Sequence, residues 1–369
     1  MMNWKRNIQF NQQKTQNEKW IYENGSDSRE FDVEVTLGKP IDILSLKLEN
    51  TADLQAKAQR VKESRTKVYS NSDNLERVTR CLVCAVSSDQ AEEVLTIYGA
   101  KYSQCKNCGH YYVLNRPTDD VLNEFYKTST EYQSTYADPK TLEKRIEWIS
   151  KPKAEYVLAQ YKKKYGRLPR KVIDVGAGSG HFVHTLRQMG VDCDGVEISK
   201  PGQEFAKEHF NVELLDVDFF KEASTFDCDM VTFWGLIEHV SRPIEMMKAA
   251  GQALSSEGMV IAEVPRWESF STAVHESFPD TVVRHLDPMD HIQCFSDSSL
   301  ASTFVLSGFD IVAAWYFGMD AYELLSQITL NTDQNKVMEQ WGEKIPILQK
   351  HLDRARLSDF LLMVGTPGK

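Results

Sequence analysis

The stretch from Lys171 to Phe182 constrains the fold more than any other part of the sequence. Residues 171–175 are a short apolar run, three glycines (Gly176, Gly178 and Gly180) follow, and a helical pattern covers 181–189. A strand, a glycine-rich turn and a helix in this order are typical of open α/β sheets, where ligands bind at the carboxyl ends of the strands. Glycine suits such a turn because it lets a ligand approach the backbone closely. We therefore expect a binding site directly after this strand.

The rest of the C-terminal half alternates in the same way. Short apolar runs that predict strands lie at 191–198, 212–215, 228–234, 259–265, 310–318 and 358–367. Helical patterns lie between several of them, at 201–210 and 243–254. Such alternation favours an α/β fold with helices on both faces of a parallel sheet. The prediction is a doubly wound, mostly parallel, seven-stranded sheet.

The N-terminal half lacks this alternation, and three units follow from the composition. Residues 1–75 are polar and are expected to form an extension of unknown role, with short strands at 30–38 and 41–48 and a helix over 51–66. Residues 76–137 hold two cysteine pairs and a tyrosine-rich connector. Residues 138–369 form the α/β unit, which opens with an amphipathic helical stretch over 141–165 that has a candidate break at Pro152.

Two Cys-x-x-Cys pairs, 20 residues apart, supply four thiols: Cys81, Cys84, Cys105 and Cys108. This spacing is a strong signal for zinc. Four thiolates complete a tetrahedral shell and leave no open position, so the predicted role of the ion is structural. The alternatives are a redox dithiol or free buried cysteines. His110 is then a bystander, and the other three cysteines, Cys193, Cys228 and Cys294, are expected to be small core residues.

The glycine loop has the pattern Asp-x-Gly-x-Gly-x-Gly, which resembles motif I of class I S-adenosylmethionine (SAM)-dependent methyltransferases. A dinucleotide fingerprint would need glycine where His181 stands, and the Gly-Lys-Ser/Thr of a P-loop is missing. Residues 226–240 resemble the fourth-strand motif of the same superfamily. The resemblance implies that SAM binds residues on or beside the first, second, third and fourth strands: Asp174, Gly176, Ala177, Gly178, Gly180, Glu197, Asp216, Asp218 and Trp234.

These cofactor residues have different expected roles. Glu197 ends the second strand, where a carboxylate accepts hydrogen bonds from ribose hydroxyls. Either Asp216 or Asp218 is expected near the adenine amine, with Asp216 preferred, and the alternative is that these acids only solvate loop ends. Trp234 is expected to wall the pocket. Family analogy also implies that the last strand is inserted antiparallel at the edge of the sheet.

Residues 80–365 together resemble the bacterial C-methyltransferases of nucleotide-linked deoxy-keto-sugars. The resemblance rests on the cysteine pairs, the following Asn-Arg-Pro stretch and the segment 287–296. That family has a Glu-His pair where this chain has Asp290 and His291. The resemblance implies that His291 is a general base and that Asp290 orients it or contacts substrate, with His239 as the second candidate base. Tyr126, Tyr132 and Tyr136 resemble aromatic residues that close over the cofactor or substrate, unless they serve packing alone.

The formal net charge of −10 argues against general affinity for nucleic acid. No run of about 18 apolar residues is present, and the N-terminus lacks the apolar core of a secretory signal, so we expect a cytoplasmic protein. The leading hypothesis is a methyltransferase acting on a small molecule, a nucleotide-linked keto-sugar or glycan precursor. The alternatives are a methyltransferase that grips a nucleic acid or protein with its zinc module, and a non-catalytic SAM-binding module. The oligomeric state is left open.

Overall fold

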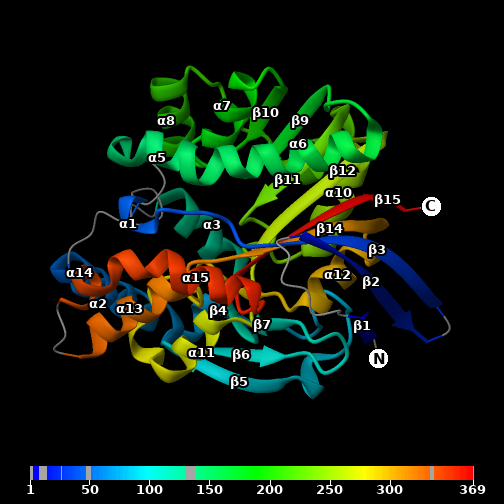
Figure 1. Ribbon diagram of the computed structural model, residues 1–369. Helices are drawn as coiled ribbons and strands as arrows, with labels where there is room; N and C mark the ends of the chain where they lie inside the picture. Colours follow the sequence, from blue (N-terminus) through cyan, green and yellow to red (C-terminus); the bar gives the residue numbers. More distant parts are fainter. Residues whose placement is uncertain are drawn as a thin grey trace.

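The computed structural model describes residues 3–7, 15–25, 27–46, 51–128, 138–332 and 336–368, and a large central sheet dominates them (Figure 1). Within these residues the sheet has nine strands in the order β1-β2-β3-β14-β15-β12-β11-β9-β10. Their bounds, in sheet order, are Asn3–Asn7, Thr15–Asn24, Asp27–Leu37, Phe309–Phe317, Phe360–Pro367, Leu254–Pro265, Cys228–Trp234, Lys171–Val175 and Asp192–Val196. The predicted count of seven is corrected to nine.

The sheet is mixed rather than mostly parallel. Strands β10, β9, β11 and β12 are parallel neighbours, and β3 is parallel to β14. Strand β15 is antiparallel to both β12 and β14, which confirms the expected direction of the last strand. Its expected place at the edge is wrong, because β15 lies inside the sheet, between β14 and β12. The strand expected at 212–215 is reduced to one parallel bridge between Leu215 and Val196, since Leu215 alone makes the ladder hydrogen bonds there.

The N-terminal extension supplies the added strands. Strand β3 pairs with β14 from Glu34↔Ala313 to Leu37↔Tyr316, and β2 pairs with β3 along its whole length. Side chains of β3 alternate between buried and exposed, and Val33 and Val35 are fully buried. Burying this face of β3 on the sheet stabilises its place there. The N-terminal extension, whose role the sequence left unknown, therefore widens the central sheet itself.

The strand expected at 41–48 is wrong within the described residues. The chain instead forms the short helix α1 (Ile43–Leu46), and residues 47–50 lie outside the described part. The Asp42 carboxylate accepts a hydrogen bond from the Ser45 amide at 3.2 Å, which favours a helical turn over an extended run. The expected helix after it is confirmed as α2 (Thr51–Tyr69).

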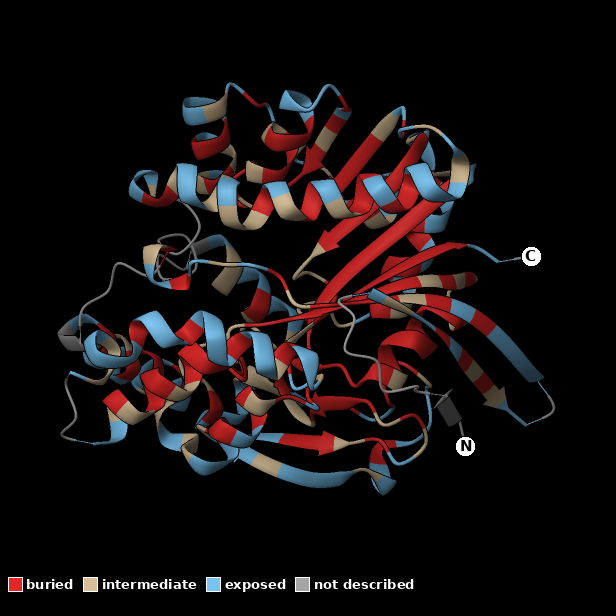
Figure 2. Cartoon of the chain, in the orientation of Figure 1, coloured by how far each residue is buried: buried red, intermediate tan, exposed pale blue. Residues whose placement is uncertain are grey.

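Helices cover both faces of the sheet, as predicted, and strands such as β9, β11 and β15 between them are largely buried, whereas the β2–β3 hairpin has many exposed residues (Figure 2). One face packs against α6 (Lys151–Tyr165), α7 (His181–Gln188) and α8 (Lys200–Phe210). The other packs against α10 (Pro243–Ala253) and α12 (Asp297–Leu306). Neighbouring residues of β9 show the division, because Val172 belongs to the first core and Ile173 to the second.

The helical stretch expected over 141–165 is interrupted one turn before Pro152. Helix α5 (Leu142–Arg145) leads into a π-helical turn (Ile146–Ser150), and α6 then ends at Gly166 in a left-handed conformation. Proline removes an amide donor, which weakens the regular ladder just before it. The interruption turns Arg145 and Ile149 toward the carboxyl ends of the sheet strands, where both line a cavity.

Two small sheets and a set of helices complete the fold below the central sheet (Figure 1). The four-stranded sheet has the order β13 (Gln293–Cys294), β7 (Tyr111–Val113), β6 (Ala100–Gln104) and β5 (Glu92–Ile97), and β4 (Leu75–Arg77) pairs with β8 (Asn115–Pro117). The remaining longer helices are α3 (Asp119–Thr128), α11 (Phe270–Ser277), α13 (Asp320–Asn331) and α15 (Ile345–Arg354). Strand β13 comes from the α/β unit and pairs with β7, so it joins that unit to the four-stranded sheet, the cysteine-bearing sheet, whose β6 and β7 flank Cys105 and Cys108.

We expect Trp20→Ala to lower the free energy of unfolding by about 3–5 kcal/mol, as for other large buried side chains. Trp20 on β2 is 1% exposed, and its indole donates a hydrogen bond to Glu18, which is itself ion-paired with Arg356. Urea unfolding measures the change. Trp341→Ala is the matched control, because Trp341 is 51% exposed and its loss should cost less than about 0.5 kcal/mol. Equal effects would show that β2 is not part of the cooperatively folded sheet.

Candidate functional site

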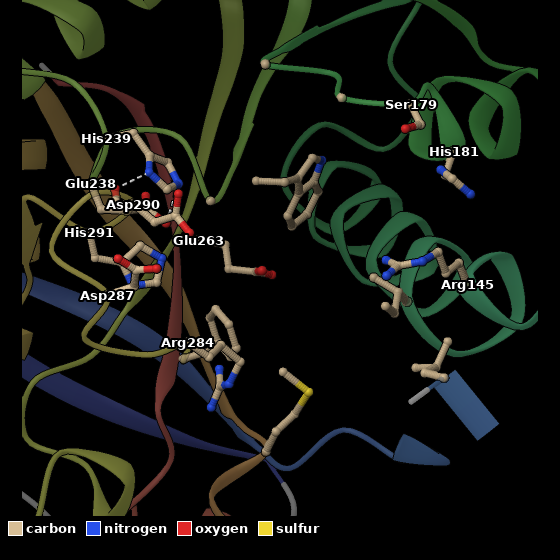
Figure 3. Close-up of a pocket in the computed structure, with 18 of the residues that line it drawn as sticks. Arg145, Ser179, His181, Glu238, His239, Glu263, Arg284, Asp287, Asp290 and His291 are labelled. Carbon is tan, nitrogen blue, oxygen red and sulfur yellow. Dashed lines mark hydrogen bonds and ion pairs between the residues drawn. The ribbon is translucent and has the colours of Figure 1, made fainter. Parts of the chain in front are cut away.

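One cavity of about 340 Å³ opens at the carboxyl ends of β9, β10, β11 and β12 (Figure 3). The glycine loop and Glu197 form one end of it. A polar cluster of the buried Glu238 and the partly buried His239, Asp290 and His291 also lines it. Residues of α1, α2 and α13 close the remaining side. Segments far apart in the sequence therefore share a single enclosed space.

The glycine loop follows β9 in left-handed turns. Gly176, Gly178 and Gly180 all have positive φ angles, of 74°, 55° and 74°. A Cβ added at Gly180 would lie 2.8 Å from the Cβ of Ala206, so this glycine lets α7 approach α8. A Cβ at Gly178 would meet nothing within 4 Å. The open side of Gly178 is thus available for a ligand that lies along the backbone.

Glu197 fixes the loop from the next strand. Its two carboxylate oxygens accept hydrogen bonds from the amides of Gly178 and Ser199, each at 2.7 Å. Burial raises the pKa of Glu197, and these two amide hydrogen bonds oppose that effect. The Thr232 hydroxyl donates to Asp174 at 2.6 Å, and burial raises the pKa of Asp174 to about 7. Both acids line the cavity, as the sequence predicted.

The two other acids expected near a cofactor are not brought to this cavity. Asp216 is half exposed and ion-paired with Lys200. Asp218 accepts a hydrogen bond from the Phe220 amide at 3.1 Å and pairs with Lys221, so it caps the short helix α9 (Phe219–Glu222). Neither is among the residues that line the cavity. Their arrangement matches the alternative expectation that they serve loop and helix ends.

The two histidines of the central cluster are held by main-chain carbonyls. The Nδ1 atom of His239 hydrogen-bonds the carbonyl oxygen of Asp290, and Nδ1 of His291 hydrogen-bonds that of His285 at 2.6 Å. A carbonyl only accepts, so each Nδ1 carries the hydrogen and each Nε2 keeps a lone pair. Burial lowers the pKa of His239 to about 3 and that of His291 to about 4. Both rings are therefore neutral at pH 7.

Carboxylates surround this histidine pair. Glu238 is 1% exposed, and its Oε1 lies 3.7 Å from Nε2 of His239. Burial raises the pKa of Glu238 well above its usual range. The predicted orientation of His291 by the Asp290 side chain is corrected, because the His285 carbonyl orients that ring. Asp290 acts on the other histidine, His239, through its backbone carbonyl, while its own side chain lines the cavity.

Side chains of helices α2 and α3 form hydrogen bonds with the loop that carries His291. The Arg65 guanidinium donates to both oxygens of Asp287, at 2.9 and 2.8 Å, in a buried pair. The Tyr126 hydroxyl lies 3.0 Å from Nδ1 of His239, so one of the three tyrosines reaches the cluster as expected. Tyr132 and Tyr136 lie outside the described residues.

Sequence reasoning missed a buried ion pair on the wall of the cavity. Lys153 of α6 pairs with Glu263 of β12 at 2.8 Å, and its ammonium lies 4.7 Å from the centre of the Trp234 ring. Trp234 walls the cavity as predicted, and its indole nitrogen has no partner within the described part of the chain. The signal for Glu263 was a carboxylate inside the otherwise apolar run 259–265.

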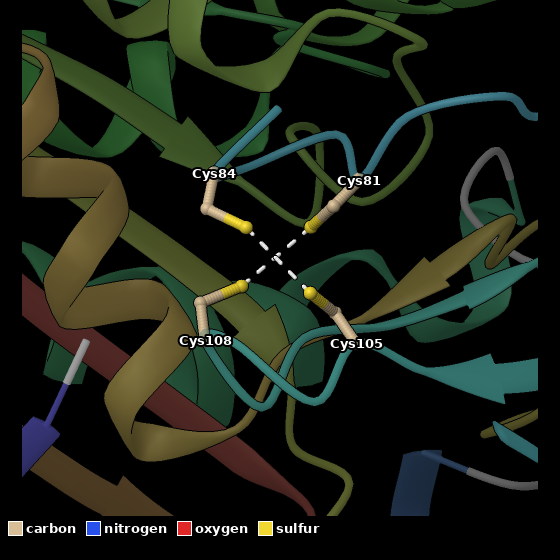
Figure 4. Close-up of side chains that lie close together, drawn as sticks. All are labelled: Cys81, Cys84, Cys105 and Cys108. Atoms are coloured by element: carbon tan, nitrogen blue, oxygen red, sulfur yellow. Dashed lines mark hydrogen bonds between the residues drawn. The ribbon is translucent and has the colours of Figure 1, made fainter. Parts of the chain in front are cut away.

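The four predicted metal-binding thiols converge (Figure 4). The sulfur atoms of Cys81 and Cys108 lie 3.5 Å apart, and those of Cys84 and Cys105 lie 3.6 Å apart, with no disulfide among them. A tetrahedral zinc ion with Zn–S bonds of about 2.3 Å would hold sulfurs roughly 3.8 Å apart, so the cluster fits this ion. Ala85 and Gly109, which follow the two pairs, both have positive φ and form the knuckle turns.

His110 is a structural neighbour of this cluster rather than a ligand. Its Nε2 lies 2.8 Å from Oε1 of Gln293, and its Nδ1 lies 3.3 Å from the Ser299 hydroxyl. The Gln293 amide donates in turn to the carbonyls of Ile237 and Val240, at 2.9 and 2.7 Å. This buried amide therefore connects the cysteine-bearing sheet, the loop after β11 and the segment after His291.

With this geometry established, comparison with known families gives a match. Residues 147–314 match the family model described as a methyltransferase domain. The matched region starts in the π-helical turn before α6 and ends inside β14, so it contains the glycine loop and the whole central cluster. The cysteine pairs and the N-terminal strands lie outside it.

Curated relatives that match are named ubiquinone biosynthesis O-methyltransferase. The Nitrosococcus oceani protein is 28% identical over 98 residues, 25% of this chain and 42% of that protein. The Actinobacillus pleuropneumoniae serotype 5b protein is 23% identical over 158 residues, 40% of this chain and 64% of that protein. The match thus spans less than two thirds of these relatives. Together with the family model, they support a SAM-dependent methyltransferase enzyme.

Solved structures align more loosely. The plantazolicin methyltransferase BpumL, in a complex with a substrate analogue and SAH, has a TM-score of 0.42 at 14% identity, covering 68% of this chain and 98% of that one. A SAM-dependent methyltransferase from Archaeoglobus fulgidus has a TM-score of 0.40 at 18% identity, covering 62% and 99%. Similarities at this level assign nothing to this chain. Among the described residues, no helix is long and apolar enough to cross a membrane.

We expect the purified protein to contain about one zinc ion per chain, and Cys84→Ser to lose it, because a tetrahedral site needs all four thiolates. Elemental analysis by mass spectrometry measures the content. Cys193→Ser is the control, since Cys193 is a buried core residue outside the cluster and its variant should keep the ion. Zinc retained after Cys84→Ser, or lost equally in both variants, would contradict the assignment.

Proposed function

We propose that this protein transfers a methyl group from SAM to a small-molecule acceptor that lies over Glu238, His239 and His291. The observation that carries the proposal is a single cavity that joins the glycine loop and Glu197 to this polar cluster. A cofactor site and an acceptor site must share one space, because methyl transfer is an in-line displacement between two bound molecules. Zinc in the cysteine cluster would serve the fold alone.

The residues at the cofactor end fit SAM. Gly178 leaves room beside the backbone, and Glu197 presents a carboxylate at the end of β10. The Trp234 indole nitrogen and Nε2 of His181 are buried with no partner within the described residues, so they offer hydrogen bonds to a ligand. When bound, SAM supplies an electrophilic methyl carbon on a positively charged sulfur. The chain contributes alignment, which is worth up to about 7–11 kcal/mol in favourable cases.

The acceptor loses a proton at the histidine pair. As the acceptor atom forms its bond to the methyl carbon, the carbon–sulfur bond breaks and its electrons remain on sulfur. The proton of the acceptor passes to a neutral imidazole, and the lone pair on Nε2 of His291 or His239 is free to take it. His291 is the first candidate and His239 the second, with the carbonyls of His285 and Asp290 holding the rings in place.

A nucleotide-linked keto-sugar or glycan precursor is the proposed acceptor class. Lys57 and Arg145 line the cavity, and cationic side chains suit the phosphates of such a molecule. A second candidate is a hydroxylated ring with an apolar substituent, as the name of the ubiquinone-pathway relatives suggests. The apolar wall opposite the cluster favours it; this wall comprises Ile41, Ile43, Leu46, Leu54, Phe317 and Tyr322. A sugar acceptor would be methylated on carbon or oxygen, whereas a hydroxylated ring would be methylated on oxygen.

A polymer gripped by the cysteine cluster is less well supported. Cys81, Cys105 and Cys108 are buried, and the Ser298 hydroxyl of α12 donates to the carbonyl of Cys108. The cluster thus faces the protein interior. The deciding experiment measures label transfer from methyl-labelled SAM to nucleotide keto-sugars, their reduced forms and hydroxylated aromatic rings. No transfer to any of them, with SAM binding intact, would favour the polymer or the non-catalytic alternative.

Glu197→Ala should raise the dissociation constant for SAM at least about 10-fold, because a hydrogen bond to a charged group contributes about 1.5–3 kcal/mol. Isothermal titration calorimetry measures it. Asp216→Asn is the paired variant: Asp216 lies outside the cavity, so its affinity for SAM should change less than about twofold. A large loss with Asp216→Asn and none with Glu197→Ala would reverse the two roles.

His291→Gln should lower kcat by about 10²–10⁴-fold, the usual contribution of a general base, and leave the affinity for SAM unchanged. Steady-state kinetics on an acceptor from the panel measure kcat. His351→Gln is the control, since His351 is exposed on α15, and it should leave kcat unchanged. Full activity of the His291 variant would move the base role to His239.

A further inference from the structure

We infer that Glu238, His239 and His291 form a binding site for a divalent metal ion, distinct from the cysteine cluster. Each of the three offers one ligand atom, and these atoms lie within 4.8 Å of one another. The residues come from two loops, one after β11 and one before β13, that meet in the cavity (Figure 3). The role of the ion rests on the proposed function, but its binding does not.

The histidines have the arrangement of metal ligands. A histidine that binds a metal usually donates its other ring N–H to a carbonyl or carboxylate, which fixes the tautomer and aims the lone pair. His239 and His291 each give their Nδ1 hydrogen to a backbone carbonyl, of Asp290 and His285 respectively. Each Nε2 lone pair is left for an ion. The Nε2 atom of His239 lies 3.7 Å from Glu238, so both face the same point.

The third ligand is a buried carboxylate that has one oxygen without a partner. Glu238 is 1% exposed, and its Oε2 atom has no hydrogen-bond partner among the described residues. The nearby cation, Lys153, already pairs with Glu263. A divalent ion would neutralise this buried group and complete its coordination.

The donor set selects the kind of ion. Two imidazoles and one carboxylate, with the remaining positions open, suit first-row divalent ions such as Mn²⁺, Fe²⁺, Co²⁺ or Zn²⁺. The open positions face the cavity in which the acceptor is proposed to lie. An acceptor oxygen bound there would lose its proton more readily, as metal-bound water does. His239 and His291 then serve as ligands rather than as bases, because one lone pair cannot hold both an ion and a proton. The proton of the acceptor passes instead to the carboxylate of Asp290, which lines the same cavity.

The test uses the full chain with its zinc content verified, and Mn²⁺ as the probe because thiolate clusters favour softer ions. Titration followed by electron paramagnetic resonance should show about one bound Mn²⁺ per chain. Glu238→Gln and His291→Ala should weaken binding at least about 10-fold, as lost or mispositioned ligands do. The matched controls are Glu339→Gln and His351→Ala, which change exposed residues and should bind Mn²⁺ normally. Thermal melting checks that every variant is folded.

Two outcomes would overturn the inference: no bound Mn²⁺ in the unaltered protein, or binding that Glu238→Gln and His291→Ala leave unchanged. Methyl transfer measured in parallel separates this result from the proposed function. Mn²⁺ bound at the three residues without any methyl transfer would leave the site standing and the function rejected. Transfer at full rate in a chelator that spares the zinc would leave the function and the binding site standing and reject the role of the ion in the reaction.

Discussion

The buried side-chain amide of Gln293 is the interaction on which the candidate site depends. Its oxygen faces His110 beside the cysteine cluster, and its nitrogen donates to Ile237 and Val240 just after β11. Glu238 and His239 lie between those two carbonyls in the chain, and His291 is two residues before the glutamine. Leaving a buried amide without hydrogen bonds costs free energy, so Gln293 and its three partners, His110, Ile237 and Val240, stabilise one another's positions. The cysteine cluster, although remote from the cavity, thereby positions the histidine pair.

Much of the α/β core could be predicted from local patterns. The local sequence of residues 171–180 is enough to predict a strand followed by a glycine-rich turn. The apolar runs at 228–234 and 259–265 are strands, as expected. The antiparallel last strand came only from a family resemblance. Pairings between residues far apart in the sequence could not be predicted. The alternation in 30–38 identifies a strand, but it does not identify its partner β14 at residues 309–317. The error at 41–48 has another cause, because a short apolar run fits a strand or a helix equally well.

The candidate site, like the fold, has a part that the sequence predicts and a part that it does not. Types and positions in the sequence pointed to Glu197, Trp234, His239 and His291, all of which line the cavity. The carbonyls that orient the histidines could not be foreseen, since any residue supplies a carbonyl and only the folded backbone decides which one is near. The Lys153–Glu263 pair was equally hidden, because its partners belong to a helix and a strand 110 residues apart.

The place of β3 in the sheet has a consequence for biosynthesis. Its neighbour β14 comprises residues 309–317, and β14 in turn pairs with β15 at residues 360–367. A ribosome makes strand β3 well before it makes β14, the strand with which β3 pairs. Pairings of such long sequence separation form slowly and leave strand edges exposed in the meantime. The β2–β3 hairpin therefore lacks the neighbour of its β3 edge, and the apolar side chains of Val33 and Val35 lack their final cover, until residues 309–317 have been made.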